Sequence, residues 1–210
     1  MTQKLLIVGA GSVGKFIAYN INQFTQTFEI IGFLDDDVSK HNTAISGFPV
    51  LGAVDKLLEF SGKDIAIVWG IAFPSIKKKL FDQYKNLAFD FPNFIATDSW
   101  VSEAVRFGKG CIVYPGTAIN YETAIDDFVV INMNCSLGHN CSIQSFSSLA
   151  PGVNLGGNTT IGSCVELGIG ASTIQGITIG DKATIGGQAM VVCNVSNEDV
   201  VVGIPAKSIK

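Results

Sequence analysis

The sequence is poor in charged residues, and this excludes two classes of protein. Only 15% of its 210 residues are charged, against about 25% in an average soluble domain. A disordered, solvated chain is therefore excluded, and most of the chain must pack away from water. The net charge is −4, and the only notable basic cluster is Lys77-Lys78-Lys79. A surface that follows nucleic-acid phosphates needs many more cations, so we expect no nucleic-acid partner.

Long apolar runs and paired cysteines are missing as well. No stretch approaches the roughly 18 uncharged apolar residues of a membrane span. The N-terminal apolar run breaks into glycines rather than a cleavage site, and we therefore expect a cytoplasmic protein. The cysteines are odd in number and lack C-x-x-C spacing, which argues against a disulfide framework or a zinc clip. We expect reduced thiols at all five positions, Cys111, Cys135, Cys141, Cys164 and Cys193.

Glycine is abundant, with 23 residues, and a six-residue repeat fills the second half of the chain. From Ile95 to Val191 every sixth residue is a large apolar one, except Thr173. A small or β-branched residue follows four positions after most of them. Three short extended pieces then make one coil of eighteen residues, with two inward positions in every six. A sandwich would need turns every 8–12 residues and would not hold one phase. We predict an all-β parallel β-helix over residues 93–210.

The first ninety residues lack the six-residue repeat, and in them short apolar runs typical of strands alternate with segments of helical spacing. We expect strands at residues 4–8, 28–34 and 65–69. Helical segments are expected at Val13, Ile17, Ile21 and Phe24, over residues 54–60, and after Pro74. This alternation predicts a small parallel sheet with helices on its faces, an α/β half-Rossmann domain over residues 1–92.

A glycine motif, Gly9-x-Gly11-x-x-Gly14, connects the first strand to the first helix. Bare backbone N–H groups at a helix N-terminus favour a phosphate, and an acidic residue about 20 positions further on can accept from a ribose hydroxyl. Asp35 has that spacing from Gly14. The domain has half the strands that a dinucleotide needs, so a single nucleotide is favoured. Glycines that serve only helix–strand packing, and a solvated strand end at residues 35–37, remain the alternatives.

His139 is the only histidine of the repeat half, and it occupies the third position of its hexapeptide counted from Leu137. This is a turn position, so we expect the side chain to point outward. Eighteen residues away in either direction stand Tyr121 and Gly157, and the glycine leaves room beside the imidazole. A surface histidine without a role is the alternative. A zinc site of three histidines is excluded by counting, so we expect no metal. We expect His41 to be a solvated loop residue.

Several motifs together resemble a known family. They are LLIVGAGSVGK at the start, IIGFLDDD at the end of the second strand, GFPVLG at residues 47–52, Ile131-Asn132 with Gly-His seven residues later, APG at 150–152 and GIPAK at 203–207. Nearly the whole chain resembles the hexapeptide-repeat, left-handed β-helix acyltransferases, in their bacterial sugar O- and N-acyltransferase branch. Sialic acid and bacillosamine acetyltransferases are of this type.

The resemblance implies an acetyltransferase that acts on an amino or hydroxyl group of a nucleotide-linked sugar, in surface-polysaccharide or glycan biosynthesis. It implies a homotrimer with acetyl-CoA along the cleft between neighbouring β-helices. His139 matches the general base, with Asn140 beside it. The residues that match the sugar-nucleotide site are Gly9, Gly11, Ser12, Gly14, Asp35, Asp36, Gly70 and Asn132. Those assigned to the acetyl-CoA site are Ser148, Gly157, Ile169 and Gly187.

Two departures from the family pattern concern the catalytic residues. Most relatives follow the catalytic histidine with Asp or Glu, whereas Asn140 follows here. Either His139 is then less basic, or another carboxylate replaces the missing one. Some amino-sugar acetyltransferases carry a second histidine where this chain has Ser148. Val13 and Asp98 also differ from the usual residues, so the details of substrate binding cannot be copied from relatives.

The residues themselves are consistent with acyl transfer from a thioester. When an amine or hydroxyl attacks a thioester, a base must take the proton, and neutral imidazole suits this near pH 7. A backbone N–H at a glycine turn can hold the developing oxyanion, and Gly157 is the nearest candidate. Cys135 and Cys141 fall on inward positions, so direct transfer in a ternary complex is favoured over a cysteine nucleophile. A noncatalytic scaffold or a nucleotide-sensing protein is the other reading, which acetyl-CoA consumption with nucleotide sugars would test.

Overall fold

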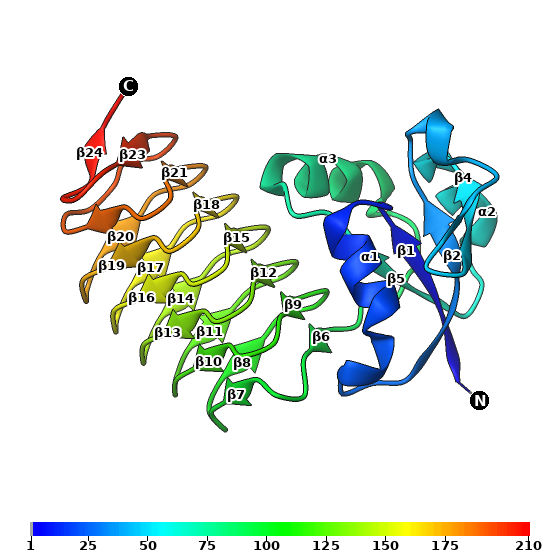
Figure 1. Ribbon diagram of the computed structural model, residues 1–210, viewed down its shortest axis with the longest axis horizontal. Coiled ribbons are helices and arrows are strands. Elements are labelled where there is room, and N and C mark those ends of the chain that lie inside the picture. Colours follow the sequence, from blue (N-terminus) through cyan, green and yellow to red (C-terminus); the bar gives the residue numbers. More distant parts are fainter. Residues whose placement is uncertain (1) are drawn as a thin grey trace. The chain divides into compact units, whose positions relative to one another are not determined.

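A computed structural model describes residues 2–210 of the chain, which form two compact units. One unit takes in the chain up to Ala72 together with Ile76–Phe94, and the other takes in Phe73–Ser75 together with Ile95–Lys210. The first is an α/β unit and the second a parallel β-helix, as the residue pattern predicts. The β-helix is left-handed, as the family resemblance implies. Figure 1 labels their elements.

The α/β unit is built on a five-stranded sheet with the order β3-β4-β2-β1-β5. The strands are β1 Gln3–Val8, β2 Phe28–Leu34, β3 Ala44–Ile45, β4 Phe48–Gly52 and β5 Ile65–Trp69. The central strand β1 pairs in parallel with both β2 and β5, and β3 runs antiparallel to β4. Its residues Leu5 to Val8 are fully buried. Parallel strands covered on both faces need such continuous apolar runs.

The helices of this unit are shorter than the apolar spacing predicts. They are α1 Ser12–Tyr19, η1 Ile21–Gln23, η2 Val38–Lys40, η3 Val54–Lys56, α2 Leu57–Phe60 and α3 Pro74–Tyr84. The expected helix through Phe24 ends at Tyr19. At its end the Phe16 carbonyl accepts from both the backbone N–H and the side-chain amide of Asn20, at 3.1 and 2.8 Å. Asparagine side chains that bond the local backbone are common where a helix ends. The expected helix over 54–60 is a 3₁₀ turn followed by one α-helical turn.

The β-helix repeats one short element, a strand of two residues. The strands are β6 Phe94–Ile95, β7 Trp100–Val101, β8 Arg106–Phe107, β9 Ile112–Val113, β10 Ala118–Ile119, β11 Ala124–Ile125, β12 Val130–Ile131, β13 Ser136–Leu137, β14 Ser142–Ile143, β15 Ser148–Leu149, β16 Asn154–Leu155, β17 Thr160–Ile161, β18 Glu166–Leu167, β19 Ser172–Thr173, β20 Thr178–Ile179, β21 Thr184–Ile185 and β22 Met190–Val191. Each ends on one member of the six-residue series. An antiparallel pair, β23 Val200–Val202 and β24 Lys207–Ser208, follows.

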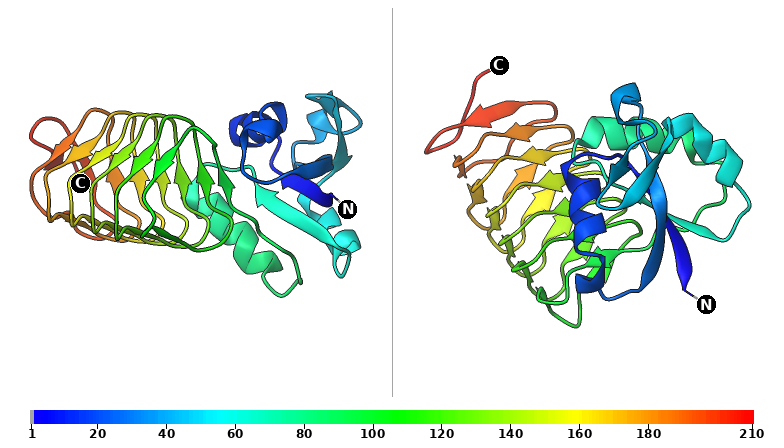
Figure 2. Two further views of the ribbon diagram at one scale, coloured as in Figure 1. Left: turned by 90° about the horizontal axis from the view of Figure 1, so that it is seen from below. Right: turned by 45° about the vertical axis from the view of Figure 1, so that its right-hand side comes forward.

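These strands stack into three parallel sheets, because each pairs with the strand eighteen residues away. We call them the six-stranded sheet (β7 to β22), the five-stranded sheet (β8 to β20) and the eight-stranded sheet (β6 to β24). Figure 2 shows the successive coils along the β-helix. The chain turns a corner between sheets after every strand. Residues in the same turn of successive coils therefore form a column along that corner.

The interior confirms the predicted phase of the repeat. From Cys111 onward both inward columns are buried, and the column of small residues includes Cys111, Cys135 and Cys141. The first members of the two columns, Ile95, Val101, Val105 and Phe107, are partly buried. Cys164 is half-buried and Cys193 exposed, as their positions off this column predict. Turn positions six residues apart, from Gly110 to Gln188, have a positive φ. Asparagine and glycine tolerate this left-handed conformation best, which explains why they are frequent there. Among residues 2–210, no helix has the length and apolarity needed to cross a bilayer.

Candidate active site

His139 lies in the turn between β13 and β14, at the corner between the six-stranded and five-stranded sheets. We call its column, with Tyr121 one coil before and Gly157 one coil after, the His139 column. The Tyr121 ring stacks on the imidazole with centroids 5.3 Å apart and planes 9° apart. On the other side, a Cβ on Gly157 would lie 2.8 Å from His139 Nε2. The glycine therefore leaves the space that the imidazole needs.

The other ring nitrogen of His139 is held by a short chain of hydrogen bonds. His139 Nδ1 lies 2.8 Å from Oδ1 of Asn140, whose Nδ2 donates to Oε2 of Glu122 at 2.5 Å. An ionised carboxylate only accepts, so the amide must turn its NH₂ group toward Glu122 and its oxygen toward His139. Nδ1 then carries the proton. His139 is half-buried, and its Nε2 is left as the basic nitrogen.

The backbone at Gly157 offers a hydrogen-bond donor beside this nitrogen. Gly157 is half-buried and its carbonyl accepts from Gly176 N at 2.9 Å, whereas within residues 2–210 its own N–H has no acceptor. The carbonyl of the same peptide unit, on Gly156, accepts from Thr159 Oγ1 at 2.6 Å. This bond fixes the peptide plane and with it the direction of the Gly157 N–H. A fixed N–H near a basic nitrogen is suited to a developing oxyanion.

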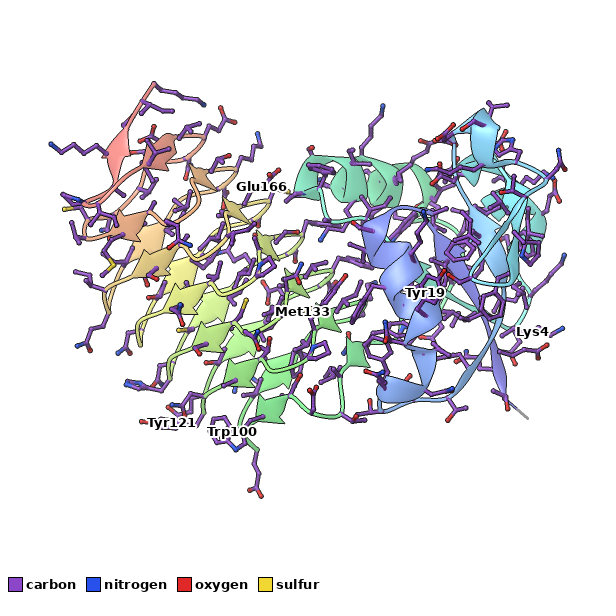
Figure 3. The ribbon with its side chains drawn as sticks, viewed as in Figure 1. Lys4, Tyr19, Trp100, Tyr121, Met133 and Glu166 are labelled. Atoms are coloured by element: carbon purple, nitrogen blue, oxygen red, sulfur yellow. The ribbon has the colours of Figure 1, made fainter. Side chains whose placement is uncertain are left out.

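Other residues expected at the site lie on a different corner of the same chain. Asn132, Ile169 and Gly187 lie in turns between the eight-stranded and six-stranded sheets, and Ser148 lies on β15 of the eight-stranded sheet. Ile169 is 61% exposed. Figure 3 shows Tyr121 and Met133, the neighbour of Asn132, at separate places on the β-helix. One chain therefore brings Gly157, but none of these four residues, to the corner of His139.

In the α/β unit, three of the predicted site glycines are closely packed and a fourth, Gly11, faces open space. A Cβ on Gly14 would lie 2.0 Å from the Gly9 carbonyl oxygen, and one on Gly70 would lie 2.7 Å from Gly14 Cα. Gly9 has φ +101° and also abuts Gly70. Close packing of β1, α1 and β5 therefore requires these three glycines. Nothing lies within 4 Å of a Cβ on Gly11, which precedes α1. Packing does not explain this one glycine.

Asp35 and Asp36 lie at the end of β2, and both carboxylates bind backbone amides of their own unit. Asp35 Oδ2 accepts from Ala10 N at 2.7 Å and from Lys40 Nζ at 3.1 Å, and its Oδ1 accepts from Asp37 N at 2.9 Å. Asp36 Oδ1 accepts from Val54 N at 2.9 Å. Burial by itself raises the pKa of Asp35, but the two amides and Lys40 outweigh it and hold the pKa below its ordinary value. Asp35 thus fastens the glycine loop.

The structure corrects the expectation for His41 and adds one residue, Glu122, that the sequence did not point out. His41 is not simply a solvated loop residue, because its Nε2 lies 2.7 Å from the Asp35 carbonyl oxygen, to which it donates. Glu122 was not singled out, although it precedes Asn140 by one coil. The eighteen-residue stacking that placed Tyr121 beside His139 could also have found it.

The comparisons with known proteins cover both units. Residues 4–84 match the protein family described as the PglD N-terminal domain. The acetyltransferase domain of PglB from Neisseria gonorrhoeae, solved with acetyl coenzyme A, is 30% identical with a TM-score of 0.91, and the match covers 100% of both chains.

A second similar structure is PerB from Caulobacter crescentus in complex with CoA and GDP-perosamine. It is 27% identical with a TM-score of 0.90, and the match covers 99% of this chain and 97% of that one. Variants of this perosamine N-acetyltransferase in which one histidine is replaced by Asn or Ala match at 26% identity, with a TM-score of 0.91 and the same coverage.

Proposed function

The chain belongs to the bacterial sugar acetyltransferases of the hexapeptide-repeat family, and from this we propose that it transfers an acetyl group from acetyl-CoA to the amino group of a nucleotide-linked sugar. One observation carries the assignment to the His139 column. His139 stands in an accessible turn with Nδ1 hydrogen-bonded and Nε2 left as a base. The relatives solved with acetyl-CoA, CoA and GDP-perosamine support the two substrates.

In the proposed reaction, His139 Nε2 accepts the proton that the sugar amine loses as its nitrogen bonds to the acetyl carbonyl carbon. Acetyl-CoA supplies an acyl group activated as a thioester. The bond between this carbon and sulfur breaks, and His139 returns the proton to the departing CoA thiolate. The Gly157 N–H faces the charge that develops on the carbonyl oxygen. Proton, acyl group and leaving group balance in this single transfer, so no cysteine nucleophile is needed.

We propose that the site is completed by a second copy of the chain in a homotrimer. The His139 column and the residues matched to substrate and acetyl-CoA, such as Asn132 and Ile169, occupy different corners of one β-helix. A corner of one copy packed against another corner of its neighbour would unite them around one ligand. Cyclic assembly achieves this with identical, repeated interfaces.

The α/β unit is proposed to hold the nucleotide part of the nucleotide-linked sugar, which is the acetyl acceptor. The open space at Gly11 and the exposed Ser12, at the start of α1, support a phosphate there. Asp35 and Asp36 shape this loop through backbone amides, with Gly70 packed behind it. We further propose a cytoplasmic role in glycan or surface-polysaccharide biosynthesis. Within residues 2–210 the five cysteines form no disulfide with one another, which favours a reducing compartment.

The test is acetyl-CoA consumption with a panel of nucleotide-linked amino sugars and their hydroxyl counterparts. Consumption with an amino sugar is expected, and consumption only with hydroxyl sugars would assign O-acetylation instead. No consumption with any of them would favour a scaffold or a nucleotide sensor.

The shared site is tested by mixing two inactive variants, His139→Ala and Asn132→Ala. If each site joins His139 of one copy to Asn132 of another, mixed trimers contain some intact sites and activity returns. A monomer by light scattering that is fully active would contradict the trimer.

A further inference from the structure

Glu122 and Asn140 occupy the same turn position in successive coils, eighteen residues apart. Both have left-handed backbone conformations, with φ of 55° and 58°. This shared geometry directs the two side chains along the same corner, and Asn140 Nδ2 donates to Glu122 Oε2 at 2.5 Å. The stacking of coils therefore supplies a carboxylate next to the turn of His139, although none follows His139 in the sequence.

The contacts on the two faces of the His139 ring fix its plane but do not distinguish its two flipped orientations. Tyr121 stacks on one face and the Gly157 backbone crowds the other, so the plane of the ring is fixed. Turning the ring by 180° about its Cβ–Cγ bond would preserve both contacts and would exchange Nδ1 with Cδ2 and Nε2 with Cε1. Within residues 2–210, only the 2.8 Å contact between Nδ1 and Asn140 Oδ1 distinguishes the two orientations. The amide of Asn140 therefore decides where Nε2 lies.

The amide of Asn140 has the same ambiguity, since its oxygen and nitrogen can exchange places. With its NH₂ toward His139, Asn140 would demand a Nδ1 that accepts, and the proton would move to Nε2. His139 could then not act as a base through Nε2. Glu122 removes this ambiguity because an ionised carboxylate cannot donate a hydrogen bond. Glu122 thus fixes the orientation of the Asn140 amide, and this amide fixes the orientation and tautomer of the His139 ring.

We propose that Glu122 is a positioning residue for the acetyl transfer, acting through Asn140 to keep His139 in the tautomer with a free Nε2. The inference rests on the proposed function, in which His139 is the general base. Glu122 and Asn140 are both exposed, so water screens the charge of Glu122. Its effect is therefore on tautomer and orientation more than on the stability of a charged imidazole. A carboxylate holds the catalytic imidazole in the correct tautomer in the same way in the serine-protease triad.

The test uses ¹⁵N NMR of histidine-labelled protein at about pH 8, above the ordinary imidazole pKa of ~6.5. The variant is Glu122→Gly, because glycine accepts the left-handed backbone without strain. The matched control is Glu198→Gly, which removes a glutamate with φ 61° near the C-terminal end of the β-helix. Wild type and control should show His139 protonated on Nδ1. Glu122→Gly should show a mixture of tautomers.

Kinetics and a rescue variant distinguish positioning from a structural role. In Glu122→Gly, kcat should fall about tenfold with both KM values nearly unchanged, far less than the ~10⁴ that loss of the correct tautomer costs in a serine-protease triad. Adding Asn140→Asp places a carboxylate directly on Nδ1 and should restore the tautomer and most of kcat. An unchanged tautomer in Glu122→Gly, or a kcat loss that Asn140→Asp does not rescue, would overturn the proposal.

The result stays separate from the test of the proposed function. The tautomer is read by NMR without substrates, so it reports on Glu122 whether or not the acetyl transfer is correct. Normal kcat in His139→Ala would instead overturn the role of His139 as the base, whatever the NMR spectrum shows.

Discussion

The hydroxyl of Thr173 accepts a hydrogen bond from the backbone N–H of Gly156 at 3.1 Å. In the preceding coil, the equivalent N–H of Gly138 donates to the main-chain carbonyl of Leu155 at 2.9 Å. Thr173 is the one residue that interrupts the apolar series, and it is 7% exposed. Its hydroxyl also lies 3.1 Å from Thr159 Oγ1, which holds the Gly156 carbonyl. Two buried hydroxyls thus hold both ends of Gly156, directly before Gly157.

We predict that Thr173→Val lowers kcat about tenfold, because the peptide that carries the Gly157 N–H loses part of its support. Full loss of an oxyanion donor costs roughly 10²–10³. Valine keeps the shape and the β-branch but leaves the Gly156 N–H without this acceptor, so the melting temperature should fall modestly. Ser147→Ala is the control, since it removes a buried hydroxyl that donates to Gly162 O at another corner. Steady-state kinetics of both variants are the measurement, and equal kcat values would contradict the prediction.

His139→Ala should lower kcat by roughly 10² or more while binding of both substrates stays nearly intact, because a general base acts mainly in the transition state. Initial-rate kinetics give kcat, and calorimetry gives the two dissociation constants. A matching loss of binding would indicate that His139 holds substrate instead. Near-normal kcat would exclude it as the base.

Asp35→Ala should raise KM for the nucleotide sugar and leave kcat and the KM for acetyl-CoA nearly unchanged. The carboxylate binds Ala10 N and so holds the glycine loop, far along the chain from the reacting groups. A contact that is equally strong in ground and transition states affects binding alone. The two KM values, measured on one preparation, test this. Lost turnover at saturating substrate would contradict the assignment of nucleotide binding to the α/β unit and of catalysis to the β-helix.

The stability that Asp35 contributes should depend on pH. Its pKa is lower in the folded chain than the ordinary 3.8, because amides and Lys40 favour the carboxylate despite burial. The contribution is therefore fully present above 3.8 and is lost as the pH falls through the folded pKa. We expect the gap in melting temperature between wild type and Asp35→Asn to be constant from about pH 5 to 7 and to shrink below about pH 4. Thermal unfolding across this range is the measurement, and a gap that widens with acid would contradict it.

Thiol reactivity should follow the columns of the β-helix. Burial raises the pKa of Cys135 to about 11 and also raises that of Cys141, so few thiolates form there at neutral pH. Cys111 is equally buried, whereas Cys193 is exposed and should react first. Time-resolved labelling with a thiol reagent, followed by mass spectrometry, orders the sites. Rapid native labelling of all three buried thiols would be incompatible with this packing.

Much of the β-helix was predictable from the sequence because its geometry is periodic. A constant coil of eighteen residues converts a distance along the chain into a neighbour in space. The arithmetic that fixes the inward cysteines also placed Tyr121 and Gly157 on either side of His139, and the structure confirms both. No other information was needed, since each coil repeats the position of the last.

The hydrogen bonds of the site depend on tertiary structure, because they require a choice among rotamers that spacing does not specify. The step from Asn140 to Glu122 and the replacement of a ladder bond by Thr173 are of this kind. The α/β unit lacks a fixed period altogether. There, only the folded backbone shows that Gly14 is required by packing against Gly9, while Gly11 faces open space. Sequence periodicity thus determined the columns of this protein, and three-dimensional contact decided which atoms within them meet.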